Sequence, residues 1–259
     1  MLKAKKSLGQ NFLVNAGVIQ KILNAAKITN SDLIVEIGPG KGFLTEELRK
    51  KANRVIALEK DHRLISILKN TFHGSGNVEI IESDVLKFNP YSIFPSPYSI
   101  IHNPYKIVAN IPYYITSHLL RTIFERWPQP TLIVLMVQKE VAQRIMAKPP
   151  DMNLLVLSVQ FYAEPKIISY VSRGSFRPMP KVDSAIIRLV PNDNQRLTTP
   201  NQQQLFKLIK TAFAGKRKQL KNTIGSEVLK NTGVKPESRP EELSLNDWLK
   251  IADNTKIVL

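Results

Sequence analysis

The 259-residue sequence contains no cysteine. This absence excludes a disulfide framework, thiolate zinc sites and a cysteine nucleophile, and it is typical of proteins from a reducing compartment. The sequence has only four histidines, at positions 62, 73, 102 and 118, and their spacing is not that of metal ligands. We therefore expect a protein without a bound metal.

Long apolar runs are also missing. No run approaches the roughly 20 consecutive apolar residues that a membrane-spanning helix requires. The N-terminus is basic, but no apolar stretch of the signal-peptide type follows it before the first motif, at residues 8–13. We therefore expect no targeting segment, no membrane partner and a cytoplasmic location.

Acidic residues are few relative to basic ones, 21 against 37, which gives the chain a net charge of +16. A basic excess of this size favours a polyanionic partner, because each phosphate that is neutralised releases counterions. The basic residues cluster at 3–6, 173–181 and 207–221. These clusters favour a nucleic acid over a membrane surface, which would call for an amphipathic helix with large exposed apolar residues.

The apolar residues that are present, 43% of the chain, suffice for a large core and exclude global disorder. Their periodicity predicts strands at residues 33–37, 54–59, 78–82, 105–109 and 131–137, and helices at 15–27, 43–51, 63–72, 116–125 and 139–147. This alternation predicts an α/β fold in which a parallel sheet carries helices on both faces. Residues 154–162 and 185–190 are predicted to be two further strands that form an antiparallel edge, and the proline-containing residues 92–104 a loop.

A polar break at residues 191–195 is the predicted domain boundary. It separates residues 1–190, the α/β domain, from residues 191–259, which read as a small all-helical domain. Apolar residues between 205 and 213 form one helical face of this second domain, and a last helix is expected at residues 243–251. Because the basic stretch at residues 214–221 lies between them, the helical domain is predicted to bind RNA.

The stretch at residues 35–45 predicts a strand, a tight turn and a helix whose N-terminus faces a bound ligand. Gly38, Gly40 and Gly42 read G-x-G-x-G, and Phe43 stands where a dinucleotide fingerprint has its third glycine. With Glu36 two residues ahead, the pattern is similar to the first motif of S-adenosylmethionine-dependent methyltransferases. The alternative is an ordinary Gly-Pro-Gly turn between a strand and a helix.

Two acidic residues follow at the ends of the next two predicted strands. Glu59 lies roughly 20 residues after Gly38, where a carboxylate can accept both ribose hydroxyls of an adenosine ligand. Asp84, at the end of the third strand, can accept a hydrogen bond from the adenine amino group. The alternatives are a surface carboxylate beside Lys60 for Glu59, and a helix or turn cap for Asp84.

Residues 110–113, Asn-Ile-Pro-Tyr, end the fourth predicted strand. The Asn110 side-chain oxygen and the Ile111 backbone carbonyl can accept hydrogen bonds from an exocyclic amine, and the Tyr113 ring can stack on the base, with Pro112 between them. Such acceptors aim the nitrogen lone pair at a sulfonium methyl without a strong base, so catalysis would depend on positioning and electrostatics. An adenine in structured RNA or DNA has to be flipped out to enter the site. The alternative is a simple strand-ending turn.

Two further segments are candidates for contacts with the substrate. Phe176 precedes two prolines and is a candidate to pack on the second face of the target base, with Arg177 and Lys181 meeting phosphates. The alternative is a rigid proline-rich connection. Residues 8–13, Leu-Gly-Gln-Asn-Phe-Leu, precede the first helix, and their alternative is a polar turn that leads into it.

Taken in order, these stretches resemble the ribosomal RNA adenine N6,N6-dimethyltransferase family, and most closely its bacterial small-subunit type. The resemblance also includes residues 136–141, 213–218 and 239–244, and it extends over essentially the whole chain. It implies a Rossmann-like methyltransferase sheet with a small all-helical C-terminal domain. It also implies dimethylation of two adjacent adenines near the 3′ end of small-subunit (16S) rRNA during ribosome assembly.

The resemblance implies S-adenosylmethionine as methyl donor, S-adenosylhomocysteine as product, and no metal. The partner that it implies is the immature 30S subunit, and the default state is a monomer. The donor-binding residues that it implies are Asn11, Leu13, Gly38, Gly40, Glu59, Asp84 and Asn110. Asn110, Ile111, Pro112, Tyr113 and Phe176 are the implied catalytic and base-holding residues.

Three alternative functions stay open. A large-subunit rRNA adenine methylase of the macrolide-resistance type would share the glycine loop and Asn-Ile-Pro-Tyr, although residues 115–120 and 215–221 favour the small-subunit enzyme. A DNA adenine methyltransferase usually has two prolines after its Asp or Asn, and here Ile111 replaces the first. A non-enzymatic RNA-binding assembly factor on the same fold is disfavoured, because Glu59, Asp84 and Asn110 are all present.

Overall fold

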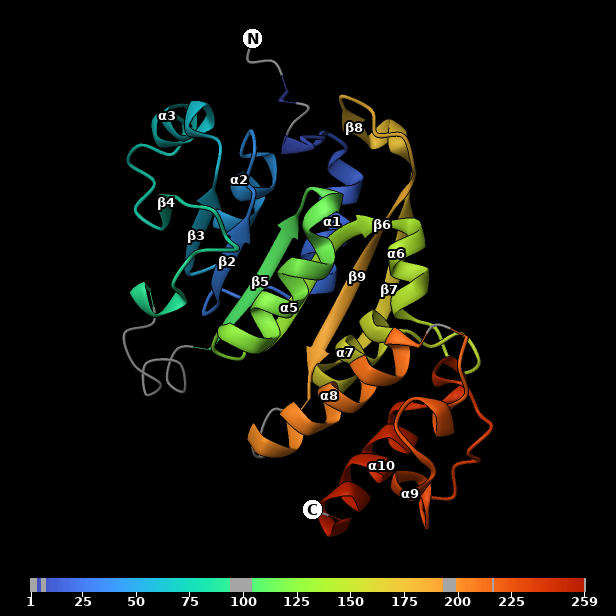
Figure 1. Cartoon of the computed structure of the whole chain (residues 1–259). Helices are drawn as coiled ribbons and strands as arrows, with labels where there is room; N and C mark the ends of the chain where they lie inside the picture. Colours follow the sequence, from blue (N-terminus) through green and yellow to red (C-terminus); the bar gives the residue numbers. More distant parts are fainter. Residues whose placement is uncertain (1–3, 6–7, 94–103, 193–198, 216, 259) are drawn as a thin grey trace. The chain divides into compact units, whose positions relative to one another are not determined.

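The computed structural model describes residues 4–5, 8–93, 104–192, 199–215 and 217–258 of the chain (Figure 1). Most of the loop expected at residues 92–104 and part of the polar break at 191–195 lie outside these ranges. Contacts divide the chain into two compact units. The first comprises Met1–Gln143 and Pro165–Pro191, and the second comprises Arg144–Glu164 and Asn192–Leu259.

A seven-stranded sheet forms the centre of the first unit, with the strand order β4-β3-β2-β5-β6-β9-β7. The strands are β2 (Leu33–Ile37), β3 (Arg54–Glu59), β4 (Val78–Glu82), β5 (Tyr105–Asn110), β6 (Leu132–Gln138), β7 (Ala163–Val171) and β9 (Ser184–Pro191). The first five are parallel, and β9 pairs antiparallel with β6. The predicted parallel sheet is therefore confirmed, as is a strand at residues 185–190.

The order of the strands reverses on the two sides of β2. The chain runs outward from β2 through β3 to β4 and then returns to β5 on the other side of β2. Ligands of open parallel sheets bind outside the carboxyl ends of the strands at such a switch point. The glycine loop directly follows β2, and Asn110 is the last residue of β5.

Helices cover the sheet of the first unit close to the predicted residues. They are α1 (Ala16–Ala26), α2 (Phe43–Arg49), α3 (His62–Thr71), α5 (Thr116–Arg126) and α6 (Lys139–Ile145). In Figure 1, α5 lies in front of the sheet and α1 behind it. Apolar residues of α1 and α2 form one buried cluster with Ile34, Val108 and Val134 of the strands. The predicted N-cap is confirmed, since the Asn15 side chain accepts a hydrogen bond from the Val18 N–H.

The prediction of a strand at residues 154–162 is wrong. These residues form helix α7 (Leu154–Tyr162), and the edge strand β7 begins only at Ala163. A short, continuously apolar run has no period that distinguishes a buried strand from a buried helix. The preceding Asn153 decides the outcome, because its side-chain oxygen accepts hydrogen bonds from the N–H groups of Leu155 and Val156 and so caps a helix.

The second unit is mainly helical in its described part, and it also includes the first residues of β7. Besides α7 its helices are α8 (Thr199–Ala214), α9 (Ser226–Leu229) and α10 (Leu245–Val258). Leu205, Ile209 and Ala212 of α8 are buried, and the Phe213 ring lies 6.3 Å from the ring of the buried Trp248 on α10. The last helix starts two positions after residue 243 and continues beyond the predicted end.

Short elements complete the described chain. A two-stranded antiparallel sheet joins β1 (Phe12–Leu13) to β8 (Phe176–Arg177). One-turn 3-10 helices form at Pro90–Ser92, Tyr113–Ile115, Arg173–Ser175, Leu220–Asn222 and Pro240–Glu242. None of the helices in the described ranges has the length and apolar character needed to cross a membrane.

Candidate active site

A pocket lies in the first unit where the chain leaves β2, β3 and β5. Residues 8–13, 36–41, 43–44, 58–60, 83–86 and 110–115 line it. The candidate residues predicted separately from five places along the sequence therefore meet in one cavity. They are Asn11, Leu13, Gly38, Gly40, Glu59, Asp84, Asn110, Ile111, Pro112 and Tyr113. Phe176 is the one candidate that does not line the pocket.

The glycine loop after β2 forms the floor of the pocket. Gly38, Gly40 and Gly42 have φ values of 71°, 61° and 82°, in the left-handed region that favours glycine. A Cβ atom on Gly40 would lie 2.9 Å from the Phe12 ring, so a side chain does not fit there. The Gly38 N–H donates to the Leu58 carbonyl at 2.9 Å, which ties the loop to β3.

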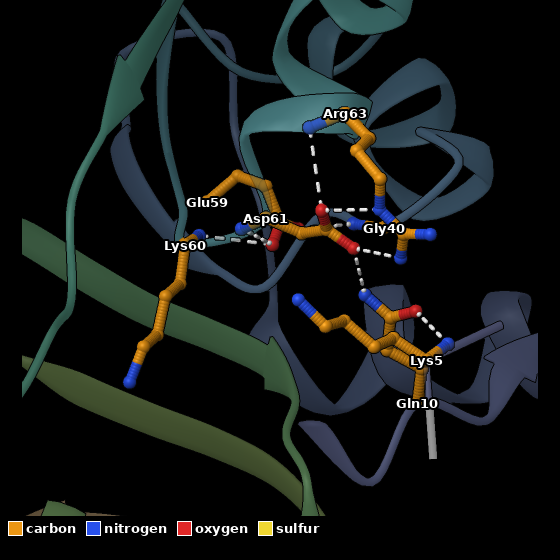
Figure 2. Close-up of polar contacts among 7 residues, drawn as sticks. All are labelled: Lys5, Gln10, Gly40, Glu59, Lys60, Asp61 and Arg63. Carbon is orange, nitrogen blue, oxygen red and sulfur yellow. Dashed lines mark hydrogen bonds and ion pairs between the residues drawn. The ribbon is translucent and has the colours of Figure 1, made fainter. Parts of the chain in front are cut away.

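Glu59 ends β3 and holds the glycine loop through its carboxylate (Figure 2). Its Oε2 accepts from the Gly40 N–H at 3.1 Å, and its Oε1 accepts from the N–H groups of Lys60 and Asp61 at 2.9 and 2.8 Å. Burial raises the pKa of Glu59, and these three N–H groups oppose the rise while the Asp61 charge adds to it. A carboxylate oxygen can accept more than one hydrogen bond, so Glu59 retains capacity for a ligand hydroxyl.

Asp84 lies two residues beyond the end of β4 rather than at its last residue. Its Oδ1 accepts from the Leu86 N–H at 3.1 Å, and its Oδ2 forms an ion pair with Lys60 Nζ at 2.8 Å. Partial burial by itself would raise the pKa of Asp84, but Lys60 and the Leu86 N–H outweigh burial and hold the pKa below its usual value. Asp84 is thus an ionised acceptor in the pocket wall as well as a turn cap.

Hydrogen bonds hold the side chains of Asn110 and Tyr113, the first and last residues of the Asn-Ile-Pro-Tyr motif. The Asn110 amide nitrogen donates to the Asn11 carbonyl at 3.1 Å, so the amide oxygen is the atom that can accept from a substrate amine. The Tyr113 hydroxyl and the Ser184 hydroxyl are 2.5 Å apart. Burial raises the pKa of the Tyr113 hydroxyl, the Ser184 hydrogen bond lowers it in part, and Asp183 raises it, so Tyr113 stays neutral.

Phe176 is fully buried, and the pocket lining does not include it. It pairs with Leu13 in the small β1–β8 sheet and belongs to the apolar cluster that contains Val171 and Ile186. Its predicted role on the second face of a base remains a prediction, which requires the ring to become accessible when RNA binds.

Glu36 also lines the pocket, although the sequence predicts no role for it beyond its place in the glycine motif. The residue is 1% exposed, and its Oε2 has no hydrogen-bond partner within the part of the chain that the structure describes. Burial raises the pKa of Glu36 to about 8, the nearby Thr45 hydroxyl opposes the rise, and the Glu59 charge adds to it. The motif spacing placed Glu36 in the strand, but the burial that retains its proton depends on tertiary packing.

Gln10 and Tyr114 also line the pocket without having been singled out. Gln10 donates to Asp61, and the Tyr114 side chain is 64% exposed at the pocket, next to Gly9. The sequence signal for Gln10 was its place inside the motif at residues 8–13, and for Tyr114 its place directly after the motif at residues 110–113. Within the described ranges, no group of three or more His, Cys, Asp or Glu residues could hold a metal ion.

Comparisons with known proteins give a family match and similar proteins over nearly the whole chain. Residues 1–256 match the family described as ribosomal RNA adenine dimethylase. A ribosomal RNA small subunit methyltransferase A from Dehalococcoides mccartyi strain CBDB1 is 44% identical over 260 residues, 96% of this chain and 88% of that protein. The protein of the same name from Clostridioides difficile strain 630 is 38% identical and covers 98% of this chain and 92% of its own length.

Two solved structures share the fold over nearly the whole chain. A dimethyladenosine transferase from Plasmodium falciparum superposes with a TM-score of 0.75 at 32% identity, over 93% of this chain and 95% of that one. The 23S rRNA methyltransferase ErmE superposes with a TM-score of 0.76 at 26% identity, over 95% of this chain and all of that one.

Proposed function

This chain belongs to the ribosomal RNA adenine dimethylase family, and we propose that it dimethylates N6 of two adjacent adenines near the 3′ end of 16S rRNA. The proposed methyl donor is S-adenosylmethionine, with S-adenosylhomocysteine as product and no metal. One observation carries the proposal: Asn110–Ile111–Pro112–Tyr113 lines the same pocket as Gly38, Glu59 and Asp84. This shared lining supports the proposal that one cavity holds both the donor and the substrate amine.

The residues of the pocket fit an adenosine ligand with a cationic tail. Glu59 at the end of β3 and Asp84 shortly beyond β4 are acceptors in the pocket wall, and among the described residues the buried Glu36 Oε2 has no hydrogen-bond partner. We propose that Asn11, Leu13, Gly38, Gly40, Glu59, Asp84 and Asn110 hold the donor. When bound, S-adenosylmethionine supplies a sulfonium methyl group that is open to attack by a nitrogen lone pair.

The substrate amine would be bound by acceptors rather than by a base. The Asn110 side-chain oxygen and the Ile111 carbonyl would accept hydrogen bonds from its two N–H groups, which directs the lone pair toward the donor. Tyr113 would stack on the flipped adenine, held in place by Ser184. Because the nitrogen becomes cationic only on methylation, its proton can then leave to water, and Tyr113 need not ionise. Phe176 would contribute the second base contact.

The small subunit is favoured over the large subunit by the relatives. Proteins named ribosomal RNA small subunit methyltransferase A are 36–44% identical to this chain, whereas the 23S rRNA methyltransferase ErmE is 26% identical. We propose that the natural substrate is an immature 30S subunit, that the enzyme acts as a monomer in the cytoplasm, and that residues 191–259 form an RNA-binding domain. A purely non-enzymatic role is disfavoured, since every proposed donor residue lines the pocket.

Transfer of labelled methyl groups to purified ribosomal subunits tests this proposal. Undermethylated small subunits and large subunits would be incubated separately with the enzyme and labelled S-adenosylmethionine. We expect label in the small-subunit rRNA alone. Label confined to the large subunit would instead support the macrolide-resistance type of activity, and label in neither would refute the proposal for ribosomal substrates.

A further inference from the structure

The segment at residues 8–13 lines the pocket along its whole length, although it is far in sequence from the other walls. One end is held by the β1–β8 pairing of Phe12 and Leu13. Its middle is held by Asn110, whose amide donates to the Asn11 carbonyl at 3.1 Å. What holds its other end therefore decides whether this wall stays closed over a bound ligand.

Gln10 provides that third attachment, and both ends of its amide are used (Figure 2). Its Nε2 donates to Asp61 Oδ2 at 2.8 Å, and its Oε1 accepts from the Lys5 backbone N–H at 2.7 Å. The contact connects a chain segment outside the main sheet to a residue that directly follows β3. A hydrogen bond to an ionised acceptor is roughly twice as strong as one between neutral groups.

Asp61 is a fixed attachment point. Its side chain is 2% exposed, and the Arg63 guanidinium binds both carboxylate oxygens, at 2.9 and 2.6 Å. Arg63 also holds the pKa of Asp61 well below its usual range, so the carboxylate is charged whenever Gln10 meets it. The Asp61 N–H donates to Glu59 Oε1, so the residue that anchors Gln10 also orients the proposed ribose acceptor.

We propose that Gln10 is a positioning residue, which fastens the 8–13 segment to Asp61 and thereby retains the methyl donor in the pocket. This inference rests on the proposed function of the pocket as a donor site. Opening the contact would release the wall at Gln10, while the hydrogen bond from the Asn110 amide to the Asn11 carbonyl would still hold the middle of the segment. The donor would then dissociate faster, while the chemical step at saturating donor would stay the same.

The Gln10→Ala variant tests the inference through donor affinity. Binding of S-adenosylhomocysteine would be measured by calorimetry, and its dissociation rate by stopped-flow displacement. We expect Kd and the dissociation rate to rise about tenfold, the effect of one charge-assisted hydrogen bond. The KM for S-adenosylmethionine should rise in parallel with kcat unchanged. Gln20→Ala, an exposed glutamine on α1, is the matched control and should behave as wild type.

A reciprocal exchange distinguishes positioning from general loss of stability. Gln10→Glu places a second carboxylate against Asp61 and should weaken binding more than Gln10→Ala does. Adding Asp61→Asn to Gln10→Glu restores a donor and an acceptor and should recover part of the affinity lost in Gln10→Glu, with Asp61→Asn alone as the reference for the loss of the Arg63 ion pair.

Two outcomes would overturn the inference in distinguishable ways. Wild-type Kd and dissociation rate in Gln10→Ala would refute the role of Gln10 while leaving the donor site in place. Failure of the wild-type protein to bind S-adenosylhomocysteine would refute the donor site itself, and with it the proposed function.

Discussion

At the scale of single residues, folding changes the protonation of Glu36. Its pKa of about 8 in the folded protein exceeds the ordinary value of 4.5, and burial is the largest cause. The folded chain therefore binds a proton that the unfolded chain has lost once the pH exceeds 4.5. The stability contributed by this proton is complete below pH 4.5 and is lost as the pH rises through about 8.

We predict that Glu36→Gln removes this pH dependence, because the amide carries no ionisable proton. Between pH 6 and pH 8.5 the wild-type melting temperature should fall relative to that of the variant, corresponding to on the order of a few kcal/mol in the free energy of unfolding. Differential scanning calorimetry across this range measures the difference. Parallel curves for the two proteins would show that Glu36 ionises normally.

Asn110 carries the proposed chemistry most directly. We predict that Asn110→Ala lowers methyl transfer by about 10²-fold or more, the usual effect of removing one preorganised group that acts on the transition state. RNA affinity should change little, since the contact with phosphates lies elsewhere. Single-turnover methyl transfer and filter binding measure the two effects. Asn70→Ala, an exposed residue of α3, is the control, and near-normal transfer by Asn110→Ala would disprove the amine-acceptor assignment.

The positions of Gly38, Glu59 and Asn110 could be predicted from the sequence, because strand ends in parallel register meet at one edge of the sheet. The hydrogen bonds and packing contacts of the candidate side chains could not be predicted. Glu59 is already bonded to three backbone N–H groups, and Phe176 is buried. Such details depend on packing between segments that are distant in sequence, which periodicity and spacing do not report.

At the scale of elements, the glycine loop is the most restrictive part of the site. We predict that Gly40→Ala lowers both the melting temperature and the affinity for S-adenosylhomocysteine, because the added Cβ meets the Phe12 ring at 2.9 Å and the φ of 61° is strained for alanine. Calorimetry measures both quantities. The matched control is Gly76→Ala, since an added Cβ there would meet no described residue within 4 Å beyond its chain neighbours, and its φ is unstrained. Equal effects of the two variants would contradict this account.

The elements themselves were predictable where their apolar pattern was long or clearly periodic. The five parallel strands and the helices between them follow from the sequence. Residues 154–162, in contrast, form a helix where the sequence analysis predicts a strand. Their mean apolar character is high on all sides, so neither period is visible. Asn153 was the local signal for a helix, and a capping residue before an apolar run deserves more weight than β-propensity there.

At the scale of the whole molecule, the net charge of +16 makes a prediction about binding. Affinity for small-subunit rRNA should fall on the order of 10²-fold between about 50 and 200 mM salt if roughly four phosphates are neutralised. The affinity for S-adenosylhomocysteine should hardly change, because that ligand carries no phosphate. Filter binding and calorimetry in the same buffers give the two slopes. A salt-independent RNA affinity would contradict an electrostatic role for the basic clusters.

The α/β class of the fold could be predicted from the sequence, but the order of the strands in the sheet could not. Alternating strands and helices indicate a parallel α/β sheet, yet the order β4-β3-β2-β5-β6-β9-β7 depends on which strands pair across long stretches of chain. The switch point beside β2 is a product of that order. It places the glycine loop and Asn110 on neighbouring strands, so the catalytic proposal depends on topology as much as on motifs.

The central claim is that this chain converts two adjacent adenines of small-subunit rRNA to N6,N6-dimethyladenosine. The most direct measurement is nuclease digestion of rRNA from undermethylated small subunits after reaction with S-adenosylmethionine, followed by mass spectrometry of the nucleosides and of the fragment from the 3′ end. We predict dimethyladenosine at two adjacent positions with the wild-type protein and none with Asn110→Ala. Unmodified adenines at those positions after reaction with the folded, donor-bound wild-type protein would contradict the claim.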